Sequence, residues 1–314
     1  MLVSFKARKD AARTDPAEDR LEALGRSLFA PAGSDGVHGR TALFETVIEA
    51  LSALITRHRE PDTEVLRFPP VMSRRHVEKA GYLHGFPHLL GCVCGLHGDE
   101  AEIHAAVGRF NAGQDWTDAL RATDLVLTPA ACYPVYPAIA ARGPLPAGGI
   151  TVDAGGSYVF RHEPSGDPAR LQMFHQREIV RIGEPETVQA WREVWRNRAV
   201  ELLGALGLEV QLEVASDPFF GRSGRMLAAS QREQELKFEV LTQIAGPEPT
   251  AIASFNYHQD HFAAAYGIEL ADGSEAHTAC LGFGLERITI ALFRRHGLET
   301  DSWPSEVRDR LWQR

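Results

Sequence analysis

The amino-acid sequence predicts an α+β fold, a mostly antiparallel sheet flanked by helices. Strand-like runs follow one another in meander order, while helical periodicity is concentrated near the ends and in the middle of the chain. Hydrophobic residues make up 44% of the 314 residues, enough to bury a sizeable core. No repeat or low-complexity linker divides the chain. We therefore expect a mobile tail over residues 1–20, followed by a single domain over residues 21–314 with its helices on one side of the sheet.

In the first half of the chain, apolar residues at helical spacing indicate helices, and β-branched runs that stop at proline indicate strands. The expected elements, in order, are a helix over residues 41–58, a strand over 63–73 broken at Pro69 and Pro70, a helix over 99–113 that Gly113 ends, and a strand over 123–137 that runs into a proline-rich turn.

The second half is read by the same rules. The expected elements are a strand pair over residues 150–163 and 170–183, a long amphipathic helix over 186–207 that Gly207 ends, a strand over 208–216, a segment over 225–241 that begins helical and ends as a strand, and, over 250–297, a further strand and then a glycine-rich turn into a helix.

Composition narrows the function classes. The formal net charge of −9 argues against a nucleic-acid partner, which needs a basic surface. No run of about 18 apolar residues predicts a transmembrane helix, and the polar N-terminus lacks the apolar core of a signal peptide, so we expect a cytoplasmic protein. Disulfides are not expected, and Cys92 and Cys94, in an apolar run, are interpreted as buried thiols.

Charged residues stand inside two of the strand-like runs. Arg161 and Glu163 lie two residues apart and face the same side of a strand, where they could present a donor and an acceptor to one ligand. Glu178, in the returning run, could lie near them across the turn. Downstream, Glu286 and Arg287 follow a glycine-rich turn at the start of an apolar helix, so Arg287 can reach an anion. Each piece alone is more often a structural feature than a site.

Taken together and in this order, the pieces resemble the three motifs of class II aminoacyl-tRNA synthetases. "FRHE" with its returning strand resembles motif 2, "GFGLER" resembles motif 3, and "LRFPPVMSRRHVEKAGYLHGFPHLL" resembles the motif 1 region of the seryl enzymes. The resemblance covers about residues 41–292. It implies the class II catalytic fold, and also a homodimer, because motif 1 builds the dimer interface in that class.

The sequence departs from that of the ordinary seryl enzymes in two ways. The stretch before the first expected helix has no heptad-patterned hairpin of the kind that grips tRNA in ordinary seryl enzymes, and "TPAACYP" places Cys132 at the glutamate of their T-x-E motif. The pattern is similar to that of the zinc-dependent seryl enzymes and especially to their shortened relatives, the amino acid:carrier protein ligases. Those enzymes activate a small amino acid with ATP and load it onto the phosphopantetheine thiol of a carrier protein. The resemblance therefore implies glycine or alanine as substrate, a carrier protein as acceptor and no tRNA.

Three residues far apart in the sequence suit a metal. Cys132, Glu178 and Cys280 each fall in a catalytic segment, two thiolates and a carboxylate suit Zn²⁺, and three protein ligands leave a fourth position open. The resemblance implies one zinc per chain, with the α-amino group of the substrate in the open position. The alternative is a pair of buried thiols and an Arg177–Glu178 ion pair. His258 and His261 could compete for metal, but we interpret them as structural or supporting residues.

The resemblance also implies roles around ATP. Arg161 would bridge the α-phosphate and the substrate carboxylate, while Cys132 and Glu178 would complete the amino acid site. Magnesium is expected with ATP, although a lysine stands near where the seryl enzymes keep an acidic residue facing the nucleotide. The remaining ATP contacts implied are Glu163 at the adenine amino group, Phe174 stacked on the adenine, Arg287 at the far phosphate, Lys237, and Ser254 and Asn256 in "ASFN".

The segment over residues 221–239 contains Arg222, Arg225 and Arg232 within about three helical turns. We interpret it as a docking helix for an acidic carrier protein, against the alternative of a solvated surface helix. Two other functions remain open. One is a zinc-dependent seryl-tRNA synthetase, and the other is a non-catalytic paralogue that binds amino acid or nucleotide. The second is disfavoured because all three motif residues, Arg161, Glu163 and Arg287, are present.

Overall fold

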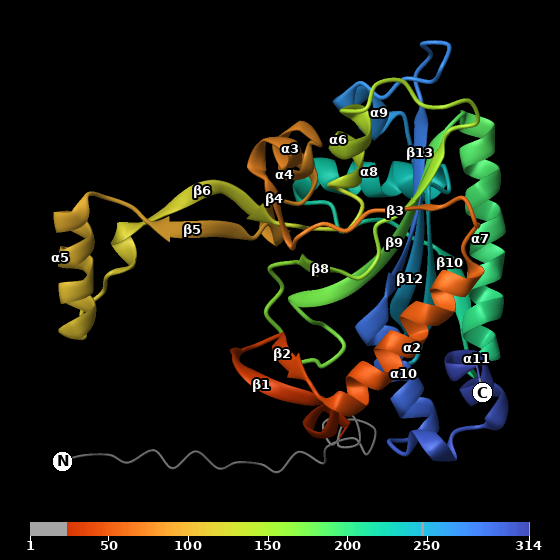
Figure 1. Cartoon of the computed structure of the whole chain (residues 1–314), viewed down its shortest axis with the longest axis horizontal. Coiled ribbons are helices and arrows are strands. Elements are labelled where there is room, and N and C mark those ends of the chain that lie inside the picture. The colour runs from red at the N-terminus through yellow and green to blue at the C-terminus, as the bar shows by residue number, and fades with distance from the viewer. Residues whose placement is uncertain (1–23, 246–247, 314) are drawn as a thin grey trace.

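The computed structural model describes residues 24–245 and 248–313, so the tail predicted over residues 1–20 lies outside the described residues. Within them, eight strands form one sheet in the order β10-β11-β12-β13-β9-β7-β3, with β8 also paired to β9 (Figure 1). Described neighbours are antiparallel except β3 and β7. The strands are β3 Glu64–Val65, β7 Ile150–Asp153, β8 Ser157–Phe160, β9 Met173–Gly183, β10 Gln211–Val214, β11 Lys237–Thr242, β12 Thr250–Gln259 and β13 His277–Gly284.

Helices cover both faces of this sheet, which corrects the expectation of one covered side. The larger group buries its apolar stripes in the main core with one face of the central strands, around Trp195, Phe283 and Phe293. It consists of α2 Ala42–His58, α7 Pro185–Ala205, α10 Leu285–His296 and α11 Ser305–Trp312. On the other face, α6 Val135–Ala140 and α9 His261–Tyr266 pack Tyr136 and Phe262 over Val180 and Cys280.

The boundaries of the long helices follow the sequence signals. Apolar residues of α2 recur every three or four positions and are buried against the sheet, as the helical periodicity predicted. Beyond α7, Gly207 has a φ of +80°, a left-handed conformation in which glycine is unstrained, so the helix ends as predicted. The short helices α6 and α9 were not predicted, because six residues carry too little periodicity to separate a helix from the neighbouring strand.

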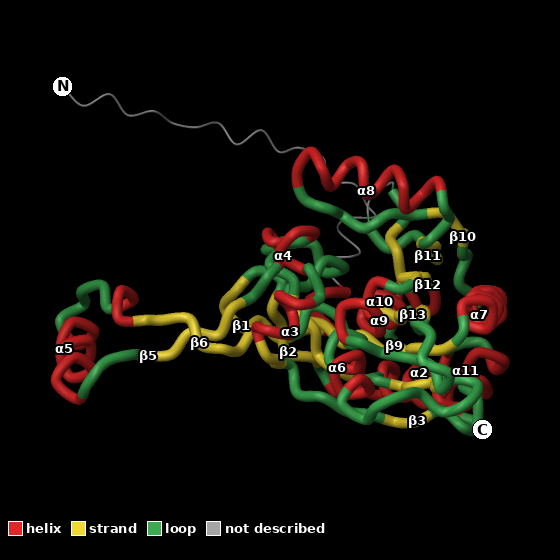
Figure 2. The backbone as a smooth tube through the Cα atoms, turned by 90° about the horizontal axis from the view of Figure 1, so that it is seen from above, coloured by secondary structure: helices red, strands yellow, loops and turns green. Residues whose placement is uncertain are grey.

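A projecting arm leaves the body between β4 Val71–Ser73 and α6 (Figures 1 and 2). It consists of β5 Cys92–Leu96 and β6 Leu120–Leu127, with α5 Glu100–Asn111 at the tip. Strand β5 pairs with β6 and lies at the edge of the three-stranded sheet β4-β6-β5. Cys92 and Cys94 are exposed there, so the expectation of buried thiols was wrong: their apolar run is part of an arm and not of the core.

The remaining elements surround the motif 2 loop. The N-terminal hairpin, β1 Phe29–Ser34 and β2 Val37–Arg40, lies beside the loop between β8 and β9 (Figure 1). The helix α8 Gly221–Glu233 precedes β11, near the edge formed by β10 (Figure 2). Short helices complete the described chain: α3 Arg74–Lys79, α4 Tyr82–Gly85, and the 3-10 turns Pro87–Leu89, Thr117–Ala119 and Thr300–Ser302. No described helix is both long enough and apolar enough to cross a membrane.

Candidate active site

The fold brings Cys132, Glu178 and Cys280 together. Cys132 follows β6, while Glu178 and Cys280 lie on the paired strands β9 and β13. One ligand atom from each side chain lies within 4.8 Å of the other two, and all three residues are buried. Gly282 stands opposite Glu178 in the register, and a Cβ there would come within 3.2 Å of the carboxylate. The glycine therefore leaves room for the side chain that the cluster needs.

The electrostatics of this cluster favour a bound cation. Burial raises the pKa of the Cys132 thiol well above its usual range, and the neighbouring Glu178 carboxylate raises it further. Burial likewise raises the pKa of Glu178. Three buried acidic groups that repel one another become compatible as anions when they share a divalent cation. The sulfur, sulfur and oxygen donor set fits Zn²⁺, so the predicted metal is consistent with the residues present.

Two residues of β12 border the cluster. Asn256 donates from its amide nitrogen toward the Cys280 sulfur at 3.6 Å, and its buried Oδ1 has no hydrogen-bond partner among the described residues. His258 Nε2 lies 3.6 Å from the same sulfur, and its Nδ1 is 3.1 Å from the Thr278 hydroxyl. Burial lowers the pKa of His258 to about 3, so the imidazole is neutral. His261 instead contacts the Ala80 carbonyl at 3.0 Å, so the two histidines have separate environments.

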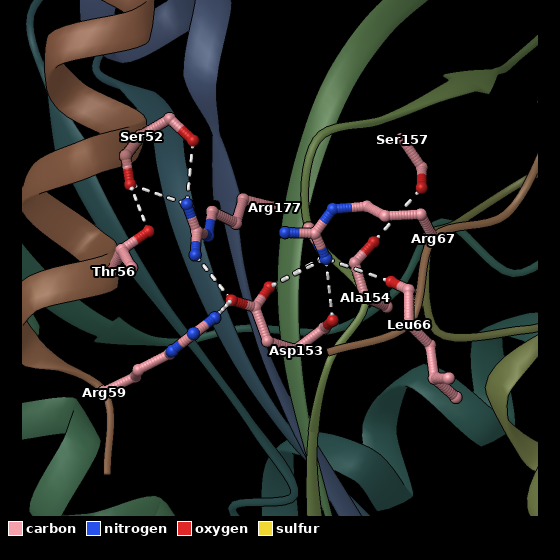
Figure 3. A network of polar contacts seen from close by, with 10 residues as sticks. Ser52, Thr56, Arg59, Leu66, Arg67, Asp153, Ala154, Ser157 and Arg177 are labelled. Carbon is pink, nitrogen blue, oxygen red and sulfur yellow. Dashed lines mark hydrogen bonds and ion pairs between the residues drawn. The ribbon is translucent and has the colours of Figure 1, made fainter. Parts of the chain in front are cut away.

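Arg177 does not pair with Glu178, and the ion-pair alternative for this segment was wrong. Successive residues of a strand face opposite sides of the sheet, and Arg177 donates instead to Asp153 at 2.5 Å and to the Ser52 carbonyl at 2.6 Å (Figure 3). Arg59 and Arg67 also approach Asp153. Burial opposes the charge on Asp153, but Arg177 and the other donors hold its pKa below the usual range.

Phe174 and Arg287 line one small cavity with Ala169, Leu171 and Glu286. The guanidinium of Arg161 lies 5.6 Å from the centre of the Phe174 ring. Its backbone N–H bonds to the Gln172 carbonyl at 2.9 Å, which ties the two sides of the motif 2 loop. An aromatic face with guanidinium groups beside it suits a nucleotide base and its phosphates.

Positive charge gathers around this cavity. Burial lowers the pKa of Arg287, and the neighbouring charges of Arg161 and Arg170 lower it further, so three guanidinium groups act on one another. Arg287 donates to the carbonyls of Ala169 at 2.8 Å and Ala251 at 3.0 Å, which fixes its position. Such a cluster creates a positive electrostatic potential that attracts a negatively charged triphosphate.

The other predicted ATP contacts have different surroundings. Lys237 is buried and already paired with Asp217 at 2.7 Å and Glu239 at 2.9 Å, so its ammonium is engaged within the chain. Glu163 lies 3.9 Å from Arg170. Ser254 stands opposite Glu239 in the register of β12 and β11.

Sequence reasoning missed Asp217, Glu239 and Arg170 as neighbours of these groups. Arg170 lies in the motif 2 loop but was given no role there. For Asp217 and Glu239 the only signal was Lys237 itself, because a buried ammonium needs carboxylates to balance its charge. On α8, Arg222 and Arg225 are exposed. Beside them, Phe220, Met226 and Leu227 are 55%, 74% and 51% exposed, so the helix presents an apolar surface as well as a basic one.

The comparisons were made with family models, curated proteins and solved structures, and no family model matches. "Amino acid--[acyl-carrier-protein] ligase 1" of Bradyrhizobium diazoefficiens is 55% identical over 93% of this chain and 90% of its own length. "Amino acid--[acyl-carrier-protein] ligase 2" of the same organism is 53% identical over 95% and 89%. A type-2 serine–tRNA ligase of Methanopyrus kandleri is 27% identical over 86% of this chain and 54% of its own length.

Among solved structures, seryl-tRNA synthetase of M. kandleri, in complex with an A. aeolicus tRNASec, superimposes with a TM-score of 0.79 at 23% identity. The match covers 98% of this chain and 62% of that one. The seryl-tRNA synthetase of Pyrococcus horikoshii, complexed with ATP, superimposes with a TM-score of 0.64 at 17% identity, over 88% of this chain and 58% of that one. These matches show that the fold is that of the class II aminoacyl-tRNA synthetases, as the motifs predicted.

Proposed function

The chain belongs to the family of amino acid–acyl-carrier-protein ligases, and we propose that it activates a small amino acid with ATP as the aminoacyl-adenylate and transfers it to the phosphopantetheine thiol of a carrier protein. The observation that carries this proposal is the position of Arg161. Its charge acts on Glu178 of the cysteine–glutamate cluster and on Arg287 of the nucleotide cavity. The Arg161 guanidinium also lies 5.6 Å from the centre of the Phe174 ring, so it is proposed to contact ligands of both subsites, which must meet for an adenylate to form.

Cys132, Glu178 and Cys280 would hold one zinc ion per chain. When bound there, zinc supplies an open coordination position that accepts a neutral amine, so the site selects amino acids by their α-amino group. Asn256, whose Oδ1 has no hydrogen-bond partner within the described part of the chain, adds an acceptor beside the same site. The zinc held by Cys132, Glu178 and Cys280 would then bind the amino end of the substrate, and Arg161 would bind its carboxylate end.

Activation requires positioning and charge stabilisation more than covalent catalysis. A carboxylate oxygen of the amino acid attacks the α-phosphorus, the bond to pyrophosphate breaks, and Arg161 stabilises the charge that develops on the α-phosphate. Phe174 stacks on adenine and Glu163 accepts from its amino group, while Arg287 binds the far phosphate. Magnesium would neutralise charge on the bound triphosphate. Ser254 is proposed as a further ATP contact, and Lys237 would act through its pairs with Asp217 and Glu239.

Transfer follows without a protein nucleophile. The thiol of phosphopantetheine attacks the carbonyl carbon of the adenylate, a thioester bond forms, and AMP leaves as its bond to the carbonyl breaks. The thiol proton passes to solvent or to the departing phosphate. The chain therefore needs to exclude water from the adenylate and to admit a long, narrow arm.

We propose glycine or alanine as the substrate. Tyr136 and Phe262 stack with their ring centres 4.0 Å apart on α6 and α9, and both pack against His258 beside the cluster. This aromatic wall supports a pocket for a small side chain. Because one methyl group changes binding by only about 1–3 kcal/mol, both amino acids are expected to react, with one preferred.

The carrier would dock on α8. Arg222, Arg225 and Arg232 offer positive charge to an acidic partner, and Met226 and Leu227 provide exposed apolar area. Arg232 also bonds the Ser216 hydroxyl at 2.5 Å, which holds one end of the helix. A chain with net charge −9 needs such a local basic surface to attract an acidic protein.

We further propose a homodimer formed through α2 and β4, the elements of motif 1. A sedimentation mass of a single chain at micromolar concentration, together with full activity, would contradict it.

A tRNA-charging activity remains the second candidate, since type-2 serine–tRNA ligases share the fold and about a quarter of their residues. This chain spans about half of their length, however. Amino-acid-dependent ATP–pyrophosphate exchange across a panel of amino acids tests the proposed activation.

A further inference from the structure

Arg40, at the end of β2, reaches the base of the nucleotide cavity from the N-terminal hairpin. Its Nη1 lies 3.0 Å from Glu286 Oε1, and its Nε lies 2.6 Å from Glu45. The side chains of Arg40 and Glu286 are only 12% and 3% exposed. A pair this well buried, between elements far apart in the sequence, differs from a surface ion pair and is costly to break.

Glu286 joins the two elements that form the cavity. Both of its carboxylate oxygens accept from the backbone N–H of His175 at 2.8 Å. His175 follows Phe174 on β9, and Glu286 precedes Arg287 on α10. The carboxylate therefore fixes the distance between the aromatic face and the guanidinium that are expected to lie on either side of the adenine.

Arg40 also fixes the ring of His175. Its Nη1 contacts His175 Nδ1, and the imidazole packs against Tyr158 with ring centres 3.7 Å apart. Glu286 Oε1 also lies 3.0 Å from His175 Nδ1, so both members of the Arg40–Glu286 ion pair contact the imidazole at the same nitrogen. Arg40 thus contacts both the side chain of His175 and the carboxylate that binds the His175 backbone.

The tip of the same hairpin holds the motif 2 loop. The Gly36 carbonyl accepts from the Gln172 backbone N–H at 2.7 Å, and the Asp35 carbonyl accepts from its side-chain amide at 2.7 Å. The Gln172 carbonyl in turn accepts from the N–H of Arg161. Gly36 has a φ of +72°, and a Cβ there would lie 3.1 Å from the Gln172 nitrogen, so glycine allows this close approach.

We propose that Arg40 is a positioning residue for ATP: through Glu286 and His175 it sets Phe174 against Arg287 at the spacing that adenine requires. The inference rests on the proposed function, since it assigns a further residue to the same nucleotide site. A merely structural role, fastening the hairpin to the body, predicts a loss of stability without a selective effect on ATP.

The test separates the two substrates in steady-state ATP–pyrophosphate exchange, with either glycine or alanine. Arg40→Ala is expected to raise the KM for ATP at least about tenfold, the scale seen when a residue that orients a binding group is lost, and to leave the KM for the amino acid within about twofold. Arg40→Lys keeps the charge but not the planar fork, so an intermediate rise of about threefold is expected.

The matched control is Arg142→Ala. Arg142 makes two contacts to Glu64 of the edge strand β3, at 2.8 and 2.7 Å, and neither residue lines the cavity, so its loss removes an arginine–carboxylate pair outside the nucleotide site. It should leave the KM for ATP unchanged. The double variant Arg40→Ala with Glu286→Gln should bind ATP no more weakly than the worse of the two single variants, because both changes break the same link.

Thermal unfolding of each variant identifies those that remain folded at the assay temperature. If Arg40→Ala unfolds, Arg40→Lys decides the question. A KM for ATP within about twofold of wild type in every folded Arg40 variant overturns the inference, even if the melting temperature falls. Wild-type protein without any exchange activity would instead contradict the proposed function, so the two failures are distinguishable.

Discussion

Arg177 and Glu178, adjacent on β9, face opposite sides of the central sheet and have different partners. Arg177 donates to Asp153 at 2.5 Å on the side covered by α2, whereas Glu178 accepts from the N–H of Cys132 on the other side (Figure 3 for Arg177). The alternation of side chains along a strand thus separates a stabilising ion pair from the proposed metal ligand. Changes on the two sides should have separable effects.

Asp153→Asn should destabilise the fold. It removes the carboxylate that balances Arg177, Arg59 and Arg67 and leaves the buried Arg177 without its counter-ion. Breaking a buried pair in this way costs about 3–5 kcal/mol. Urea unfolding near neutral pH measures the loss. Asp118→Asn, which breaks an exposed pair with Arg109, is the control and should cost at most about 1 kcal/mol.

The pH dependence of this difference has a defined sign. The pKa of Asp153 is lower in the folded chain than in the unfolded chain, although burial acts against it. Its contribution to the free energy of unfolding is therefore complete above the unfolded pKa of about 3.9 and is lost as the pH falls through the folded value. The gap between wild type and Asp153→Asn should stay constant at neutral pH and narrow below about pH 4. A gap that widens on acidification would contradict the assignment.

Cys280→Ala and Glu178→Gln should each remove zinc and abolish adenylate formation. Each change deletes one of the three donors that lie within 4.8 Å of one another. Elemental analysis of purified protein, read together with pyrophosphate exchange, measures both effects. Cys94→Ala changes an exposed thiol on β5 and should leave both unchanged. A Cys280→Ala protein with wild-type metal content and exchange activity would refute the metal site.

Arg161→Ala and Arg287→Ala should each lower activation by about 10²–10³-fold, the scale of losing one preorganised donor at a developing charge. Pyrophosphate exchange at saturating amino acid measures the effect. The melting temperature of Arg161→Ala should stay close to wild type, whereas Arg287→Ala also loses the hydrogen bonds to the Ala169 and Ala251 carbonyls, so its activity is compared at a temperature where the variant is folded. Loss of activity that merely follows unfolding would favour a structural role for these arginines.

Reversing charge at Arg222 or Arg225 should slow transfer to the carrier and leave pyrophosphate exchange intact, because both side chains are exposed on α8. Wild-type transfer should also weaken as salt concentration rises. Arg295→Glu changes the net charge by the same amount at a distant exposed position and serves as the control. Transfer rates that respond equally to all three substitutions would show that net charge, not docking on α8, controls the interaction.

The fold and the cysteine–glutamate cluster could be predicted because the order of the motifs and the types of their residues can be recognised in the sequence alone, without knowing which residues are in contact. The alternation of side chains along a strand also predicts which residues share a face of the sheet. It does not predict their partners, because the pairing of Arg177 with Asp153, or of Lys237 with Asp217, depends on how distant segments pack. Arg40 was missed for the same reason, since its partner Glu286 lies at the other end of the chain.

The arm over β5, α5 and β6 was unexpected for a different reason. Its apolar run looks like a buried strand, and nothing in a local pattern reveals that a strand leaves the body. The helix at its tip was predicted with its end at Gly113, and its start is secured by a capping box between Asp99 and Glu102. Local signals of this kind define an element, while its placement depends on tertiary packing.

The most direct test of the central claim offers wild-type protein, ATP and labelled glycine or alanine to two acceptors, a phosphopantetheinylated carrier protein and tRNA. The account predicts label on the carrier as a base-labile thioester, no label on the same carrier without its phosphopantetheine, and none on tRNA. Label on tRNA, with none on the phosphopantetheinylated carrier, would contradict it.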